Sequence, residues 1–222
     1  MTPRSDTDTM EIDTQSMTGG RDVPFAALIE GRRSVRRFRP DAIDRRLVER
    51  VVDAGRWAPC GDGAQPWRFV ILTQFDIRTR LADAMSAAWT HNLAMDGQDP
   101  DVIARRLKGS RQRLLETPVL ILLCLYLEDL DRYPDNERQA TETTMAVQSL
   151  GACAQNMLLA AYRLGLDTGW MCAPLFCPEV VRDTLELSES HVPHALLQLG
   201  HAATDPKRRP RRPLHELITL WR

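Results

Sequence analysis

Four short stretches of the sequence carry residues that could bind an anion or take part in a reaction. The first is residues 32–40 (RRSVRRFRP), which place Arg32, Arg33, Ser34 and Arg36 within five positions. Several guanidinium forks beside a hydroxyl suit a phosphate group, because arginine makes bidentate, charge-assisted hydrogen bonds. A solvated basic turn is the alternative interpretation of this stretch.

The second stretch is the glycine- and proline-rich segment 59–66 (PCGDGAQP). Gly61 and Gly63 would let backbone N–H groups approach a ligand closely, and Gln65 offers both donors and acceptors. An ordinary helix-to-strand loop has the same composition. The segment lacks the GxxxxGK[ST] pattern, and no GxGxxG follows a predicted strand, so the sequence does not support these two kinds of nucleotide site.

The third stretch is residues 169–174 (GWMCAP), which end a predicted strand. Ligands in such sheets often lie at the carboxyl ends of strands. Cys172 could be a nucleophile, but no histidine or basic residue stands beside it in the sequence. A buried, unreactive thiol is therefore the favoured interpretation.

The fourth stretch is the basic run Lys207, Arg208, Arg209, Arg211 and Arg212 near the C-terminus. A solvated tail and a nucleic-acid contact are its alternatives. The net charge of −1 and the absence of interleaved aromatic residues argue against a nucleic-acid partner. The histidines show no HExxH-like spacing, so no metal site is predicted.

The composition predicts an ordinary globular protein. The chain has 222 residues, 43% hydrophobic and 27% charged, which suits one domain over residues 22–222. Five cysteines without a CxxC pair indicate reduced thiols and a cytoplasmic location. Residues 1–21 have no apolar signal region, and we expect them to form a disordered tail.

A helix predicted over residues 141–164 is the element around which the rest is organised. Its apolar residues go all the way round, which is typical of a helix buried on most sides. We expect it to pack in its own subunit and against a partner subunit; a core helix of a monomer is the alternative. Gln148, Gln155 and Asn156 interrupt the run, so it is too short to span a membrane.

Hydrophobic periodicity predicts the other elements. A short helix capped by Asp22 ends at Gly31, longer helices follow over 41–57, 76–92 and 100–115, and another short helix is predicted over 178–185. Strands are predicted over 67–72, 118–127, 166–172 and 192–200, and residues 217–221 could add one on a partner subunit. The pattern indicates an α+β fold, an α/β sandwich in which helices cover a sheet.

Five motifs, taken in order, resemble the FMN-dependent nitroreductase family. They are RRSVRRF, WAPCGDGAQPWRF, GLDTGW after the long helix, LLQLGHA and RRPLHEL, and the resemblance extends from Val23 to Leu217. It implies a mixed sheet and an obligate homodimer, with the long helix and FMN at the subunit interface.

The resemblance also assigns the cofactor-binding residues. Arg32, Arg33, Ser34 and Arg36 would hold the FMN phosphate and ribityl chain. Arg209 and Arg211 would return to the phosphate, with Arg212 as an alternative. A second group would lie along the flavin ring, namely Cys60, Gly61, Asp62 and Gln65. A third group would lie at the N5 edge of the ring, namely Met171, Cys172 and Ala173. Cys60 stands where the family has Ser, and Gly63 where it has Asn, so one side-chain contact to the ring would be missing.

The function implied is a two-step transfer of reducing equivalents. They would pass from NAD(P)H through flavin N5 to an electron-poor small molecule such as a nitroaromatic, a quinone or a conjugated precursor. No side-chain acid, base or nucleophile is expected to be essential. A non-catalytic flavin-binding or ligand-sensing protein remains an alternative.

A narrower resemblance links two segments to the nitroreductase-type domain of deazaflavin-coenzyme biosynthesis. They are YPDNER (133–138) and GWMCAPLFCPEVVRDTLEL (169–187). In that case the acceptor would be a dehydro precursor, and Tyr133 and Arg138 would contact it. The alternative for these two residues is a surface loop.

Overall fold

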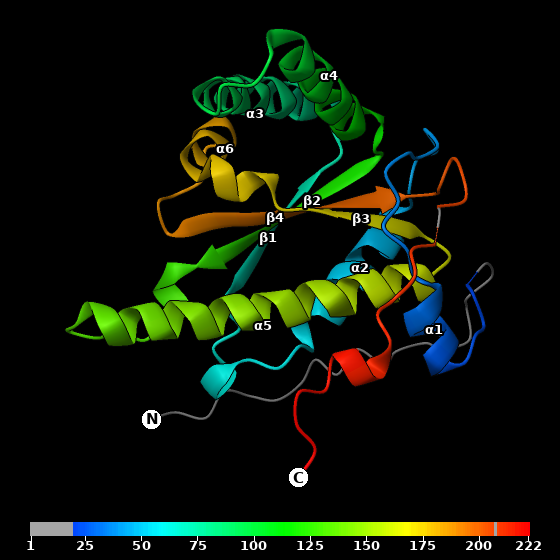
Figure 1. Ribbon diagram of the computed structural model, residues 1–222, viewed down its shortest axis with the longest axis vertical. Coiled ribbons are helices and arrows are strands. Elements are labelled where there is room, and N and C mark those ends of the chain that lie inside the picture. The colour runs from blue at the N-terminus through cyan, green and yellow to red at the C-terminus, as the bar shows by residue number, and fades with distance from the viewer. Residues whose placement is uncertain (1–19, 207) are drawn as a thin grey trace.

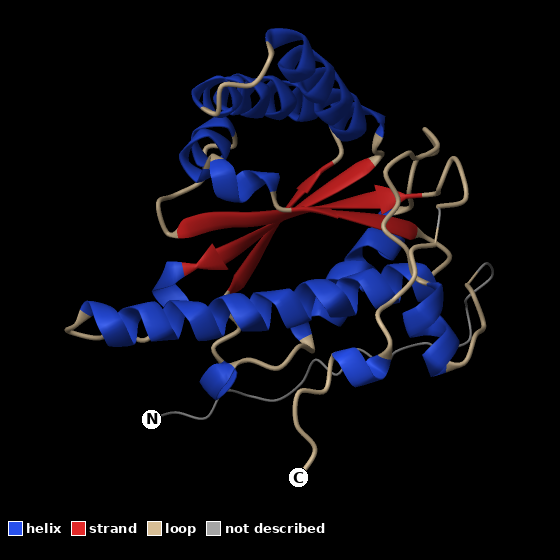
Figure 2. Cartoon of the chain, in the orientation of Figure 1, coloured by secondary structure: helices blue, strands red, loops and turns tan. Residues whose placement is uncertain are grey.

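A four-stranded sheet lies between two layers of helices in the computed structural model, which describes residues 20–206 and 208–222 (Figures 1 and 2). The strand order is β1-β2-β4-β3, and all three ladders are antiparallel. A single parallel bridge joins Ser34 to Thr168 at the β3 edge. The strands are β1 (Trp67–Leu72), β2 (Val119–Tyr126), β3 (Asp167–Met171) and β4 (His191–Gly200).

The helices divide between the two faces of the sheet (Figure 1). The residues buried on one face include those of α2 and α5, and those on the other come from α3 and α6, with Leu114 of α4. Strand β2 is buried along almost its whole length because helices cover both of its faces. The helices are α1 (Phe25–Gly31), α2 (Arg45–Arg56), α3 (Phe75–Met95), α4 (Pro100–Glu116), α5 (Asn136–Arg163) and α6 (Pro178–Thr184).

Helix α5 begins five residues before the predicted start at residue 141. The carboxylate of Asp135 accepts a hydrogen bond from the backbone N–H of Arg138, and this cap sets the first turn. The sequence predicted a helix that is buried on most sides. The single chain does not show this, because only one stripe of α5 faces the sheet. Met145 on the outer face is 47% exposed. The buried residues are Ala146, Leu150, Cys153, Ala154, Met157, Leu158 and Ala161.

The N-terminal end of the described chain differs from the prediction. Helix α1 begins after Pro24 without a side-chain cap, so Asp22 does not cap it. The carboxylate of Asp22 pairs instead with Arg163 at 3.2 Å. Arg21 lies in the predicted tail, yet its guanidinium donates to the carbonyls of Tyr162 and Leu166, both at 2.9 Å. The tail is therefore anchored at its last residue, and its residues 1–19 lie outside the described part.

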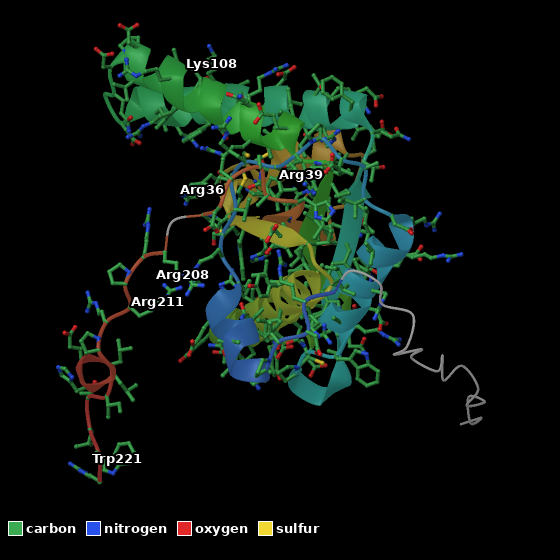
Figure 3. The ribbon with its side chains drawn as sticks, turned by 90° about the vertical axis from the view of Figure 1, so that its right-hand side faces the viewer. Arg36, Arg39, Lys108, Arg208, Arg211 and Trp221 are labelled. Atoms are coloured by element: carbon green, nitrogen blue, oxygen red, sulfur yellow. The ribbon has the colours of Figure 1, made fainter. Side chains whose placement is uncertain are left out.

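The C-terminal arm, residues 208–222, leaves the body of the molecule (Figure 3). The predicted strand over residues 217–221 does not form within the single chain, where a short 3-10 turn, Leu214–Glu216, is present instead. Leu214 is 70% exposed and Trp221 86% exposed. No helix in the described part of the chain has the length and apolar character needed to cross a membrane.

Candidate functional site

The segment after α1 runs along the open edge of β3 and is fixed there by backbone bonds. Val35 donates its N–H to the carbonyl of Thr168 at 2.8 Å, and Val35 itself is buried. Gly169 permits this close approach, because an added β-carbon would collide with the Val35 carbonyl oxygen. The side chains on either side of Val35 are thereby held at the end of the sheet where β3 begins.

Arg32, Arg33 and Arg211 form one cationic cluster. Burial lowers the pKa of Arg32, and the charges of Arg211 and Arg33 lower it further. The Nε atoms of Arg32 and Arg33 are buried without a hydrogen-bond partner. No carboxylate pairs with these three side chains within residues 20–206 and 208–222. Such a cluster is complementary to a strongly charged anion.

Arg33 is placed by its own segment. Its Nη1 donates to the carbonyls of Glu30 and Arg32, the latter at 2.7 Å, at the C-terminal end of α1. This contact leaves its Nε without a partner. Arg209 lies two residues before Arg211 on the same exposed arm.

Arg36 does not join this cluster, although the sequence grouped it with Arg32. Its charge instead lowers the pKa of Arg113 on α4, where burial is the larger cause. Ser34 is exposed and lies between the two arginine groups. The sequence prediction did not name Arg113, because nothing distinguishes it from the other basic residues of α4.

The Cys60–Gln65 loop folds as a 3-10 turn, Gly61–Gly63, against α5. The backbone N–H of Gln65 approaches the Cys60 sulfur at 3.4 Å. Gly63 has φ 72°, a value that suits glycine, and Gln65 shares the left-handed region with φ 49°. The loop borders a cavity of about 150 Å³ that is also lined by residues 129–131 and by one side of α5.

Met171, Cys172 and Ala173 follow each other where β3 gives way to a 3-10 turn, Ala173–Phe176. Backbone N–H groups in the first turn of such a helix lack helical acceptors, so they are available to a ligand. Three residues of strand separate Thr168 from Met171, a distance of roughly 10 Å. Cys172 is exposed, so the prediction of a buried thiol was wrong.

The structure brings some predicted residues together and keeps others apart. The arginine cluster and the Met171–Ala173 turn lie at the two ends of β3. The Cys60–Gln65 loop lies at a different part of α5. Gly61 lines the cavity together with Ser149 of α5. Gly31, which precedes Arg32, lies against Tyr162 near the other end of the same helix. Thirteen helical residues between Ser149 and Tyr162 amount to about 20 Å.

Two residues of the narrower resemblance have structural roles in the single chain. Arg138 pairs with Asp135 at 2.6 Å and stacks 5.3 Å from the centroid of the Tyr133 ring. Both contacts support the start of α5.

Known proteins share both the sequence pattern and the fold. The model of the nitroreductase family matches residues 29–201. The chain belongs to the nitroreductase family. It is therefore a flavin-dependent oxidoreductase, which confirms the resemblance on which the sequence prediction relied.

Three relatives illustrate the range of this family. An NADH dehydrogenase of Thermus thermophilus is 27% identical, over 86% of this chain and 92% of its own. A 5,6-dimethylbenzimidazole synthase of Rhodospirillum rubrum is 28% identical, over 78% of this chain and 80% of its own. The crystal structure of a Desulfovibrio desulfuricans protein in complex with FMN has a TM-score of 0.69 and 26% identity, covering 91% of this chain and 99% of that one.

Proposed function

We propose that this nitroreductase-family member binds FMN along the edge of β3. The cluster of Arg32, Arg33 and Arg211 carries the assignment, because the charges of these guanidinium groups interact and no carboxylate pairs with them in the described part of the chain. The phosphate of FMN supplies the missing negative charge. The flavin ring would then lie toward the other end of β3, beside the Met171–Ala173 turn.

Bound FMN supplies the two-electron chemistry that transfers reducing equivalents from NAD(P)H to an electron-poor small molecule. The chain holds the phosphate with arginines and presents backbone N–H groups of residues 171–173 to the ring. Met171 is the last residue of β3 that pairs with β4, and Cys172 and Ala173 follow it directly into the 3-10 turn, so these donors would be held in place before the reaction. No side chain of the site has to donate or accept a proton as an obligatory step.

The site is shared between two copies of the chain in this proposal. The Cys60–Gln65 loop is too far from the arginine cluster to contact the same flavin within one chain. A second copy that packs on the outer face of α5 can bring its own loop to the ring. The exposed apolar side chains of the arm, including Leu217 and Trp221, would be buried by the same partner.

The first experiment is an absorption spectrum of the purified protein after FMN addition and desalting. We expect the bands of a bound oxidised flavin near ~450 and ~370 nm, which NAD(P)H bleaches and menadione or a nitroaromatic restores. A protein that keeps no flavin would refute the binding site. Bound flavin without NAD(P)H turnover would support a storage or sensing role instead.

The shared site is tested by the variant Leu217→Asp, with Phe75→Asp as its control. Both side chains are 61% exposed in the single chain, but Phe75 begins α3 on the opposite layer. We expect light scattering to show dimers for the original chain and the control, and weaker dimers with less bound FMN for Leu217→Asp. A monomeric original chain that binds FMN would contradict the shared site.

A further inference from the structure

A cavity of about 150 Å³ lies beside the Cys60–Gln65 loop. Gly61 and Ala64 of this loop form one wall, residues 129–131 form a second, and α5 forms a third. Figure 1 shows the 3-10 turn of the loop on the side of α5 that faces away from the sheet. In the proposed shared site the flavin ring of a second copy lies against this loop, so the cavity opens beside the ring.

The wall that α5 contributes is one stripe of the helix. Its four residues recur at the spacing i, i+3, i+4 and i+7, which aligns them along one face: Glu142, Met145, Ala146 and Ser149. A volume of about 150 Å³ is enough for one aromatic ring. The polarisable sulfur of Met145 is a favourable neighbour for such a ring. The size and the apolar part of the cavity therefore suit an aromatic molecule.

The charged side chains that line this cavity are all acidic, namely Asp129, Asp131 and Glu142. The carboxylate of Asp129 pairs with Arg68 at 2.9 Å. Neither Asp131 nor Glu142 forms an ion pair within the part of the chain that the structure describes. Two unpaired negative charges beside apolar walls give a negative potential, which attracts cations and repels anions.

Hydrogen bonds hold the segment that carries Asp131 against α5. The Gln139 side chain donates to the carbonyl of Asp131 at 3.3 Å and accepts from the N–H of Tyr133 at 3.0 Å. Gln139 and Glu142 are three residues apart on α5 and are therefore neighbours on its surface. These contacts bring Asp131 and Glu142 to the same part of the cavity wall.

We propose that this cavity receives the electron acceptor and selects a cationic aromatic compound over an anionic one. The apolar stripe holds the ring, and Glu142 and Asp131 determine the specificity because their carboxylates face the positive charge. The proposal rests on the proposed flavin site, since the acceptor must reach the ring beside the Cys60–Gln65 loop. It narrows the acceptor from any electron-poor small molecule to one that carries a positive charge.

The first test measures binding by calorimetry to the FMN-loaded, oxidised protein. Phenyltrimethylammonium is the cationic ligand, and benzenesulfonate is an anion of similar size. We expect the original chain to bind the cation more tightly, and Glu142→Gln to weaken cation binding about fivefold or more. Glu137→Gln is the matched control, because it removes the same charge from an exposed position earlier on α5 that does not line the cavity. We expect the control to change cation binding less than about twofold.

Steady-state kinetics with NAD(P)H give the second readout. The acceptors are 4-nitrophenyltrimethylammonium and 4-nitrobenzenesulfonate, which differ in intrinsic reactivity, so each variant is compared by the ratio of their kcat/KM values. We expect Glu142→Gln to lower the ratio of cation to anion about fivefold or more, mainly through KM, and Glu137→Gln to retain it.

Equal binding of the two charged ligands by the original chain would overturn the proposal, as would an unchanged kcat/KM ratio in Glu142→Gln. Weaker dimers of Glu142→Gln with an unchanged ratio would overturn it too, because the cavity would then be a contact between subunits. Failure of the flavin site itself is seen separately, as the absence of flavin bands from the original chain.

Discussion

Replacing Arg32 with Gln should have opposite effects on the protein with and without FMN. In the flavin-free chain the Arg32 guanidinium is partly desolvated and repelled by Arg33 and Arg211, and its buried Nε has no acceptor. Removing the charge relieves this repulsion, so we expect the thermal midpoint of the flavin-free protein to stay the same or rise. If Arg32 had a purely structural role, its replacement would lower this thermal midpoint.

FMN binding should weaken by the value of a hydrogen bond to a charged group, about 1.5–3 kcal/mol. A loss of about 2 kcal/mol raises Kd roughly 30-fold. At an FMN concentration of 100 times the original Kd, bound ligand stabilises the native state by about 2.7 kcal/mol. The same concentration is then only about three times the variant's Kd, and the stabilisation falls to about 0.9 kcal/mol.

Thermal unfolding with and without FMN measures both effects on one sample. Arg45→Gln is the control, because Arg45 is exposed on α2 and its salt bridge in the described part of the chain is to Glu49, one turn along, at 2.7 Å. An FMN-dependent shift that is the same in Arg32→Gln and in the control would refute the phosphate assignment. A lower midpoint for flavin-free Arg32→Gln would refute the account of a repulsive cluster.

Two predictions concern the cysteines. Cys172→Ala should retain turnover within about tenfold, since the residue offers its backbone rather than its thiol; a loss of ~1000-fold in kcat would show that the thiol takes part. Burial raises the pKa of Cys124 and of Cys153 to about 12 and also raises that of Cys177. These three thiols stay protonated at pH 8, so a thiol reagent should label only Cys60 and Cys172 before unfolding. Rapid labelling of all five cysteines in the folded protein would contradict this protection.

Strong local patterns made most elements predictable from the sequence. Strand β1 has the predicted limits, Trp67–Leu72. Strand β2 was predictable because its continuous apolar run is typical of a strand that is covered on both faces. The ends of helices were less predictable, because they depend on single caps. Asp135, rather than a change in hydrophobicity, starts α5, and Pro24 rather than Asp22 precedes α1.

The site was predictable only in part, because tertiary contacts decide which arginines meet. The spacing of RRSVRRF predicted an anion-binding segment but could not show that Val35 is bonded to Thr168. Nor could it show that Arg32 interacts with the charges of Arg33 and Arg211, whereas Arg36 acts on Arg113. Arg113 lies on α4 among several other basic residues, so its interaction with Arg36 has no sequence signal.

The same bond makes Gly169 a sensitive position for both stability and binding. A β-carbon added there would collide with the Val35 carbonyl and lie 2.7 Å from Oε1 of the buried Gln198. We expect Gly169→Ala to destabilise the fold by about 1–3 kcal/mol through overpacking, which lowers the thermal midpoint by roughly 2–4 °C per kcal/mol.

Because the displaced backbone carries Ser34, FMN affinity should fall in Gly169→Ala as well. Gly109→Ala is the control: a β-carbon there meets nothing within 4 Å, and alanine stabilises a helix interior by about 0.5–1 kcal/mol. If Gly169→Ala lowered the midpoint but left the FMN Kd unchanged, the edge of β3 would support the fold without positioning the phosphate. An unchanged midpoint would mean that the segment after α1 can move away from β3 at no cost, contrary to its fixed position in this structure.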